Sequence, residues 1–343
     1  MRQSRRKFLK IAAAAGGALA LRGFPEGMLG LGAAEGSALG PVPHPGKVAL
    51  VKTGQHRDGV LRALRLFGMP DVRGKSVVVK PNFNSADPFP ASTHDETLRT
   101  LIERCKEGGA REITIADRSG MGDTARVIRD KGVDTLGREM GVGVVALEHL
   151  PASEWRNRSF PGWNWQKGVI YPVLFERAEV IIQTCCLKTH GHGGHFTMSL
   201  KNTVGMVGRR DADGYDYMRE LHGSPLQRTL IAEINQLYQP AVVVLDGIQA
   251  FIDGGPARGT LARPEVVLAG TDRVALDAVG VALLRMHGVV GATAQGRIFD
   301  QEQIRRAVAL GLGVSTPGAI EMTTDSEEGR AVIAAVRSEL SKG

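Results

Sequence analysis

The sequence predicts an α/β protein with a mostly parallel sheet covered by helices. Three observations support this fold class. Short Val/Ile-rich runs alternate with amphipathic helical patterns, and the order is strand then helix throughout the chain. No linker, low-complexity stretch or charge block divides the chain after its N-terminal segment. The sequence therefore predicts one compact α/β unit or two intimately joined lobes, spanning residues 47–313.

The first part of this order contains four apolar runs and three amphipathic patterns. We expect strands at 48–52, 76–80, 112–117 and 142–147, and helices at 59–67, 95–107 and 123–131. A Trp-bearing excursion at 154–165 and a strand at 179–183 follow. The later elements are strands at 241–246 and 265–269 and helices at 225–238, 272–286 and 301–310. Residues 314–343 are expected to add a C-terminal strand and helix that pack on the domain.

The N-terminus resembles a twin-arginine export signal. Arg5 and Arg6 lie in a basic head that precedes a weakly apolar stretch rich in Ala and Gly. A membrane-spanning helix needs roughly 20 apolar residues, and this stretch is shorter, so no permanent membrane span is expected. We expect a signal over 1–34, cleavage near Glu35 and a short linker over 35–46. The resemblance implies the twin-arginine translocase as a partner and an extracytoplasmic location. Proteins exported this way cross the membrane folded, either because a cofactor is inserted first or because the fold forms too fast for threading.

The net charge depends largely on this segment. The whole chain has 43 Lys plus Arg and 36 Asp plus Glu, a formal charge of +7. Without residues 1–34, 37 cations and 35 anions remain, which leaves +2. Because aromatic residues are also few, the composition argues against nucleic-acid binding.

Three cysteines are too few for the four thiolates of a ferredoxin cluster, so this chain alone builds no iron–sulfur cluster. Cys185 and Cys186 are neighbours, and we interpret them as small apolar residues at a strand end. Cys105 lies in a helical pattern, and we expect it to be structural.

Polar residues follow several of the predicted strands. In open parallel sheets ligands bind beyond the carboxyl ends of the strands, so these residues are candidates for a site. The candidates directly behind apolar runs are Lys80, Asn82, Asp117, Lys188, His190 and Asp246, and Thr271 and Asp272 follow the run at 265–269. Turn formers are common at strand ends, which accounts for the aspartates better than for the lysines.

Five blocks resemble one family. They are VVVKPNF (77–83), LKTH (187–190), SLKNTVG (199–205), VVLDGIQAFIDGGPARG (243–259) and GTDRVALDAVG (270–280). Together they resemble the family known as domain of unknown function 362, from about Lys47 to Gly313. The resemblance implies an α/β domain without an assigned reaction. Many relatives add a ferredoxin-like cluster domain, which the missing cysteines exclude here.

A histidine loop offers metal ligands. His190, His192 and His195 are separated only by glycines, so their imidazoles can converge on a divalent transition metal. Asp117, Asp246 or Asp253 could complete the coordination. Solvated loop histidines are the alternative interpretation.

A second hypothesis uses the cations. Lys80, Lys188 and Lys201, gathered at one sheet edge, would attract a phosphate or carboxylate. Mutual repulsion would lower a lysine pKa, so that Lys188 or Lys201 acts as acid or base with His190 or His222. Asn82 and Asn202 each follow a lysine and could bind ligand oxygens, or serve as turn residues.

We therefore expect an exported protein that binds an anionic small molecule or a metal-containing ligand at the carboxyl edge of its sheet. The alternative is a metal- or lysine/histidine-dependent enzyme that acts on a phosphate- or carboxylate-bearing substrate.

Overall fold

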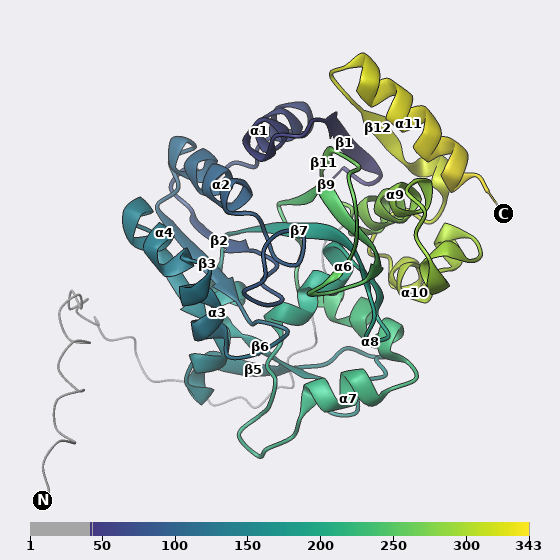
Figure 1. Cartoon of the computed structure of the whole chain (residues 1–343). Coiled ribbons are helices and arrows are strands. Elements are labelled where there is room, and N and C mark those ends of the chain that lie inside the picture. Colours follow the sequence, from purple (N-terminus) through teal and green to yellow (C-terminus); the bar gives the residue numbers. More distant parts are fainter. Residues whose placement is uncertain (1–41, 43, 343) are drawn as a thin grey trace, which may run out of the picture. The chain divides into compact units, whose positions relative to one another are not determined.

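A ten-stranded sheet with helices on both faces forms the framework of the protein, as the computed structural model shows (Figure 1). The structure describes residues 42 and 44–342, so the predicted signal at 1–34 lies outside the described residues. The main strand order is β12-β1-β11-β9-β7-β2-β3-β4. Neighbouring pairs are parallel except where β11 pairs with β1 and with β9. The predicted fold class, α/β with a mostly parallel sheet, is confirmed.

The strands of the main order are Lys47–Lys52 (β1), Ser76–Lys80 (β2), Glu112–Asp117 (β3), Gly143–Ala146 (β4), Val180–His190 (β7), Val242–Gly254 (β9), Val266–Gly270 (β11) and Glu321–Thr323 (β12). Two short strands extend the sheet, because His195–Thr197 (β8) pairs with β7 and Gly259–Ala262 (β10) pairs with β9. A separate two-stranded sheet consists of Trp155–Arg158 (β5) and Val169–Pro172 (β6).

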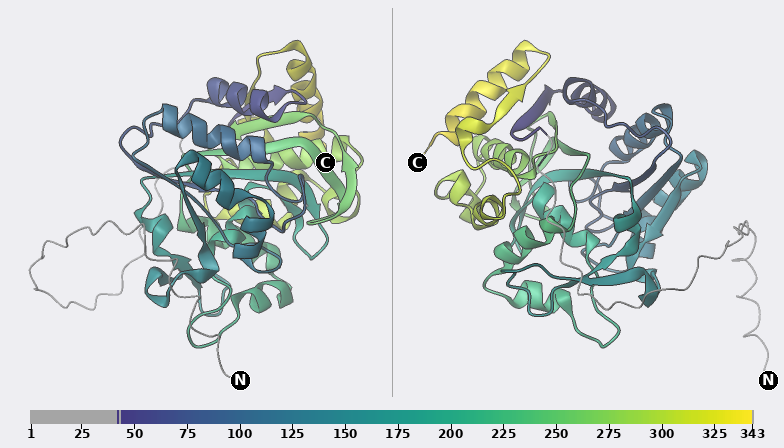
Figure 2. Two further views of the ribbon diagram at one scale, coloured as in Figure 1. Left: turned by 60° about the vertical axis from the view of Figure 1, so that its left-hand side comes forward. Right: turned by 180° about the vertical axis from the view of Figure 1, so that it is seen from behind.

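The helices divide between the two faces of the sheet (Figures 1 and 2). One face is covered by His56–Phe67 (α1), Asp95–Glu107 (α2), Thr124–Asp130 (α3) and Val133–Met140 (α4). The other is covered by Val173–Arg177 (α5), Ser199–Asn202 (α6), Tyr217–Gly223 (α7), Gln227–Glu233 (α8), Arg273–Met286 (α9), Glu302–Ala309 (α10) and Glu327–Leu340 (α11). Short 3₁₀ turns connect several of these elements.

Residues of one strand contribute to the apolar cores on both faces of the sheet, because successive side chains point to opposite faces. In β1, Leu50 packs towards α9 and α11, whereas Val51 packs towards α1 and α2. Such two-sided burial requires apolar side chains at nearly every position, which is why the sequence shows continuous Val/Ile runs.

The antiparallel strand β11 corrects one sequence prediction. Its apolar run was placed in a strictly strand-then-helix order, but β11 follows the β9–β10 hairpin and runs against its neighbours. Thr271 and Asp272 therefore leave the sheet at the edge opposite the carboxyl ends of the parallel strands. Asp272 is structural there: its carboxylate accepts hydrogen bonds from the backbone nitrogens of Gly46, Ala275 and Val314.

Two strands are longer than predicted. β7 continues seven residues beyond Gln183 to His190, and β9 continues from Asp246 to Gly254. The two extensions pair with each other across a register shift between Cys186 and Leu187. They therefore carry the LKTH block past the ends of β2 and β3.

The C-terminal segment completes the sheet. β12 pairs in parallel with β1, and α11 packs against α9 through Val336 and Leu340. The described residues 44–342 fall within one contact unit. Within the described residues, no helix is both long and apolar enough to cross a membrane.

Candidate functional site

The candidate site lies where β2 and β3 end, beneath α6 and the β7 extension. Lys80 is the last residue of β2 and Asp117 the last of β3, and these parallel strands are neighbours. A small cavity of about 50 Å³ opens at this edge. It is lined by Lys80, Asn82, Phe83, Asn84, Asp117, Arg118, Gly120, His190, Thr197, Lys201, Asn202, Val204 and Gly205.

Six predicted site residues thus surround one cavity, although they are up to 122 positions apart in the sequence. They are Lys80, Asn82, Asp117, His190, Lys201 and Asn202. The carboxyl-edge argument succeeds here because β2, β3 and β7 are parallel neighbours.

Lys80 is a fully paired cation in the wall of this cavity. It is wholly buried, and its Nζ lies 2.8 Å from Asp117 Oδ1. It also donates to Pro81 O at 2.6 Å and to Asn202 Oδ1 at 3.1 Å. Burial lowers the pKa of Lys80 and raises that of Asp117, while their mutual attraction opposes both shifts. Lys80 therefore organises the site, and its three donor positions are already used.

The two asparagines are hydrogen-bonded directly to each other, and Asn202 is also bonded to Lys80. Asn202 Oδ1 accepts from Asn82 Nδ2 at 3.1 Å as well as from Lys80, and Asn202 Nδ2 donates to Thr184 O. This network assigns the amide orientations. It leaves Asn82 Oδ1 buried without a hydrogen-bond partner among the described residues. Asn82 consequently presents an unused acceptor at the cavity.

Lys201 differs from Lys80 in having no partner. Its side chain is 8% exposed, and within the described residues its ammonium makes no hydrogen bond and no ion pair. Burial, reinforced by the charges of Lys188 and Arg118, lowers the pKa of Lys201 to about 7. The Lys201 amine therefore changes protonation near neutral pH.

His190 lies beside Lys201 on the end of β7. Its Nδ1 is 3.3 Å from the backbone nitrogen of His192, which donates to it, so the neutral ring carries its proton on Nε2. Burial, and then the Lys201 charge, lower the pKa of His190 far below its usual value. His190 is therefore a neutral donor over the physiological pH range.

Arg118 supplies fixed positive charge, although it is not among the predicted site residues. Its guanidinium donates to the carbonyls of Val204, Val207 and Ser119. Burial lowers its pKa to about 10, so it stays charged at neutral pH. Its position directly after Asp117 at the end of β3 was the available signal.

Glycines allow the cavity walls to approach one another. A Cβ on Gly194 would lie 2.4 Å from Lys201 Cε and 3.2 Å from His190 Nδ1. A Cβ on Gly205 would lie 2.5 Å from Asp117 Oδ1 and 2.8 Å from Lys80 Nζ. Both positions require glycine for close packing rather than for a left-handed backbone.

Two other predicted residues lie near the cavity without lining it. Lys188 is wholly buried, donates to Ala91 O, and has a pKa lowered by burial to about 8. His222 lies in the last turn of α7, where its Nδ1 is 2.7 Å from Met218 O, and burial lowers its pKa. Both influence the electrostatics of Lys201 or His190 from a second layer.

Asp246 belongs to a different cluster. Its Oδ2 lies 2.7 Å from His56 Nδ1 and accepts from Thr97 Oγ1 at 2.6 Å, and the His56 ring stacks on His94. The prediction placed Asp246 at the ligand because it directly follows an apolar strand run. The structure instead directs its carboxylate towards α1 and α2.

The three loop histidines do not converge. His190 and His192 have ring centroids 5.7 Å apart, but His195 interacts with Arg228, Glu302 and Gln301. Asp253 is exposed and accepts from Gly254 N. In the part of the chain that the structure describes, Asp123, Glu148 and His149 are the group of three whose ligand atoms lie within 4.8 Å of one another. Metal binding by this loop stays a prediction, because His195 does not lie with His190 and His192 as a third ligand.

The three thiols are buried and unpaired in the described structure. Cys105 packs in α2, and Cys185 and Cys186 lie inside β7. Burial raises the pKa of Cys105 to about 12 and that of Cys186 to about 11, which agrees with the prediction of structural roles.

Fold and site together define an α/β protein with a small, positively charged cavity at the carboxyl edge of a mostly parallel sheet. The chain belongs to the family described as Domain of unknown function (DUF362), whose model matches residues 77–282. That match contains every residue lining the cavity. A search of curated proteins found no match.

Proposed function

We propose that the cavity binds a small oxyanion, either phosphate or the carboxylate or phosphate group of a small molecule, with Lys201 as its principal ligand. One observation carries this proposal: Lys201 is a residue more than nine-tenths buried, and its ammonium is without a partner among the described residues. A buried cation is costly unless an anion or several acceptors compensate it. A bound oxyanion would supply that compensation.

The charge balance of the cavity supports an anion. Asp117 is already paired with Lys80, so Arg118 and protonated Lys201 leave the walls net positive. His190 Nε2 adds a neutral donor. Asn82 Oδ1, the unused acceptor, favours an oxyanion that also carries a hydroxyl hydrogen, such as hydrogen phosphate.

The size of the cavity limits the ligand. About 50 Å³ is more than one water molecule, whose share of liquid volume is about 30 Å³. The space suits one tetrahedral or planar oxyanion group.

A catalytic role is the second candidate. It is favoured by the pairing of a lysine whose pKa is about 7 with a neutral histidine at the same cavity. Lys201 would exchange the proton and His190 would orient the substrate. A bell-shaped pH–rate profile on a panel of phosphate and carboxylate esters would support it, whereas no turnover on any of them would leave binding alone.

Anion binding is tested by calorimetric titration of residues 35–343 with inorganic phosphate, sulfate and acetate. Lys201→Gln should weaken phosphate binding by about tenfold or more, because a charge-assisted hydrogen bond contributes about 1.5–3 kcal/mol. The matched control is Lys47→Gln, since Lys47 is exposed at the start of β1. Unchanged affinity in Lys201→Gln would contradict the proposal. Elemental analysis of the same preparation distinguishes a free oxyanion from a metal-containing ligand.

We also propose that the protein is exported in folded form by the twin-arginine translocase. Support comes from the Arg5–Arg6 pair before a short Ala/Gly-rich apolar stretch.

A further inference from the structure

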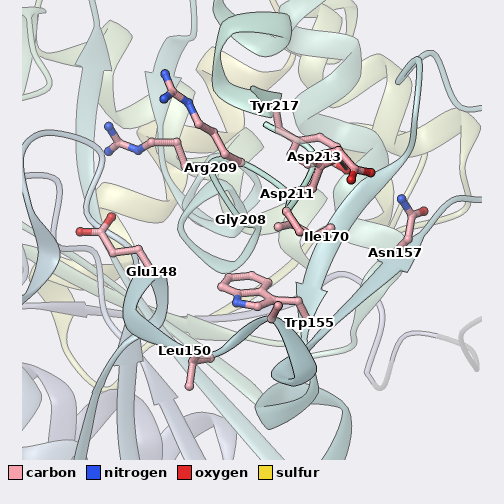
Figure 3. A pocket seen from close by; sticks show the side chains of 13 residues that line it. Glu148, Leu150, Trp155, Asn157, Ile170, Gly208, Arg209, Asp211, Asp213 and Tyr217 are labelled. Carbon is pink, nitrogen blue, oxygen red and sulfur yellow. Dashed lines mark hydrogen bonds between the residues drawn. The ribbon is translucent and has the colours of Figure 1, made fainter. Parts of the chain in front are cut away.

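A second cavity lies on the side of the molecule formed by the β5–β6 sheet and the segment before α7 (Figure 3). Its volume is about 670 Å³, within the range of roughly 300–1,000 Å³ typical of small-molecule sites. This is more than ten times the volume of the lysine cavity. It can therefore accept a whole small molecule rather than a single group.

The unusual residue of this cavity is Arg209. Among the residues that the structure describes, its side chain makes no hydrogen bond and no ion pair, and its Nε is buried without a partner. Its charge lies close enough to Arg118 to lower the pKa of that residue. Two neighbouring guanidinium groups, one of them unpaired, create a local preference for an anion.

Part of the lining is apolar. The Trp155 indole lies in the lower half of Figure 3, with Ile170 above it. Gly208 permits their close approach to the backbone, because a Cβ there would lie 2.4 Å from Ile170 Cδ1 and 3.2 Å from Trp155 Cζ3. Trp155 is partly buried and lines the cavity, so its indole offers a surface on which an aromatic ring can stack.

The acidic residues of the rim limit the charge of a ligand. Asp211 is occupied, since it accepts from Tyr217 OH and Tyr215 N. Glu148, which accepts from Thr124 N at 2.6 Å, and Asp213 lie at opposite sides of the opening, and their negative charges would repel a polyanion (Figure 3). A compact anion with a single acidic group fits this pattern better than a nucleotide polyphosphate or a nucleic acid.

We propose that this cavity is a second binding site, distinct from the lysine cavity, for an aromatic small molecule that carries one carboxylate or phosphate group. The acidic group pairs with Arg209, and the aromatic ring stacks on Trp155. The site does not depend on the oxyanion proposal, because none of its contacts involves Lys201.

The probes are indole-3-acetate, phenyl phosphate and the neutral indole-3-acetamide, titrated into residues 35–343 by calorimetry and ligand-observed NMR. At least one anionic probe should bind with a dissociation constant below about 10 mM, and about tenfold more tightly than the amide. The two anions show whether a carboxylate or a phosphate is preferred. Equal affinity for acid and amide, or binding by neither anion, would overturn the proposal.

The variants locate the site. Arg209→Gln should lower the affinity for the anionic probe about tenfold and leave the affinity for the amide unchanged. Trp155→Leu should lower the affinity for both. Arg263→Gln is the matched control, because Arg263 is exposed and its substitution removes the same charge. Lys201→Gln should bind the probe as the wild type does, and a loss there would assign the probe to the lysine cavity and refute a second site. Thermal melts check that each variant is folded.

Discussion

Lys80 and Lys201 are buried at the same cavity, but only Lys80 has partners that compensate its charge. Lys80 has two hydrogen-bond acceptors and a carboxylate 2.8 Å away, whereas the Lys201 ammonium has no partner among the described residues. The first lysine is stabilised by its surroundings, and the second is destabilised by them. This contrast separates a structural cation from one that is free to bind a ligand.

Replacement of each lysine by methionine should therefore change stability in opposite directions. Lys80→Met leaves Asp117 buried and unpaired, and we expect a loss of about 3–5 kcal/mol in the free energy of unfolding. Lys201→Met removes an uncompensated amine, and near pH 7 we expect a gain of about 1–3 kcal/mol.

The sign for Lys201 follows from its pKa, which is about 7 in the folded protein and 10.5 ordinarily. Between these values the unfolded chain binds a proton that the folded chain does not, so wild-type stability rises with pH. The gain in free energy of unfolding of Lys201→Met over the wild type should therefore shrink as the pH rises towards about 10, as measured by urea unfolding. Lys47→Met is the control, and a loss of stability in Lys201→Met would show that Lys201 is structural.

Sulfate affinity should depend on pH through the same residue. Sulfate keeps its charge across the neutral range, so a change in affinity reports on the protein. Because Lys201 binds an anion only when protonated, affinity should be highest below about pH 7 and fall by up to about tenfold per pH unit above it. His190 stays neutral throughout and contributes no change. Calorimetric titrations between about pH 6 and 9 with a flat profile would argue against Lys201 as the ligand.

The lysines were predictable as strand-end residues, but their roles were not. Asp117 comes from β3 and Ala91 from the loop before α2, so the partners of Lys80 and Lys188 depend on tertiary packing. No local pattern around residue 201 indicates that its ammonium is unpaired. Asp246 is a strand-end residue whose predicted place at the ligand is wrong, because its carboxylate contacts His56 and Thr97 instead.

At the level of elements, the β7–β8 hairpin brings His190 and the Gly194 backbone against Lys201 of α6. Gly194→Ala would place a methyl group 2.4 Å from Lys201 Cε. The end of a lysine can move, so we expect a stability change within about 1 kcal/mol but a displaced ammonium. Sulfate affinity should then fall about tenfold in the titration used above.

Gly223→Ala is the control for this variant. Gly223 is exposed at the end of α7, and a Cβ there meets no atom within 4 Å. Unaltered sulfate binding in Gly194→Ala would mean that Lys201 need not occupy its present position to bind an anion.

The elements themselves differed in how well the sequence indicated them. β2, α2 and β3 have the predicted bounds, because apolar runs and helical periodicity end at clear polar residues there. The ends of β7 and β9 were missed, since polar and glycine residues in a paired ribbon carry no period-2 signal. The direction of β11 was not predicted because a run of apolar residues does not show which way its strand runs in the sheet. The Gly- and Pro-containing turn at 254–259 was the local sign of a reversal.

At the scale of the whole molecule, export is the prediction to test. A C-terminally tagged chain, expressed in a bacterium with an active twin-arginine system, should appear in the envelope fraction with a mass reduced by cleavage near residue 35. Changing both Arg5 and Arg6 to lysine should leave the full-length chain in the cytoplasm. Arg22→Lys is the matched control. Equal distribution of the double variant and the wild type would contradict the proposal.

The pairing of β12 with β1 sets the order in which this fold can be completed. β1 is the first strand of the described sheet and its outer neighbour β12 is the last, so a chain still tethered to the ribosome near position 320 lacks that neighbour. The outer edge of β1 therefore stays unpaired until residues 321–323 have been synthesised. Under the proposed export of the folded protein, translocation would have to wait for this pairing.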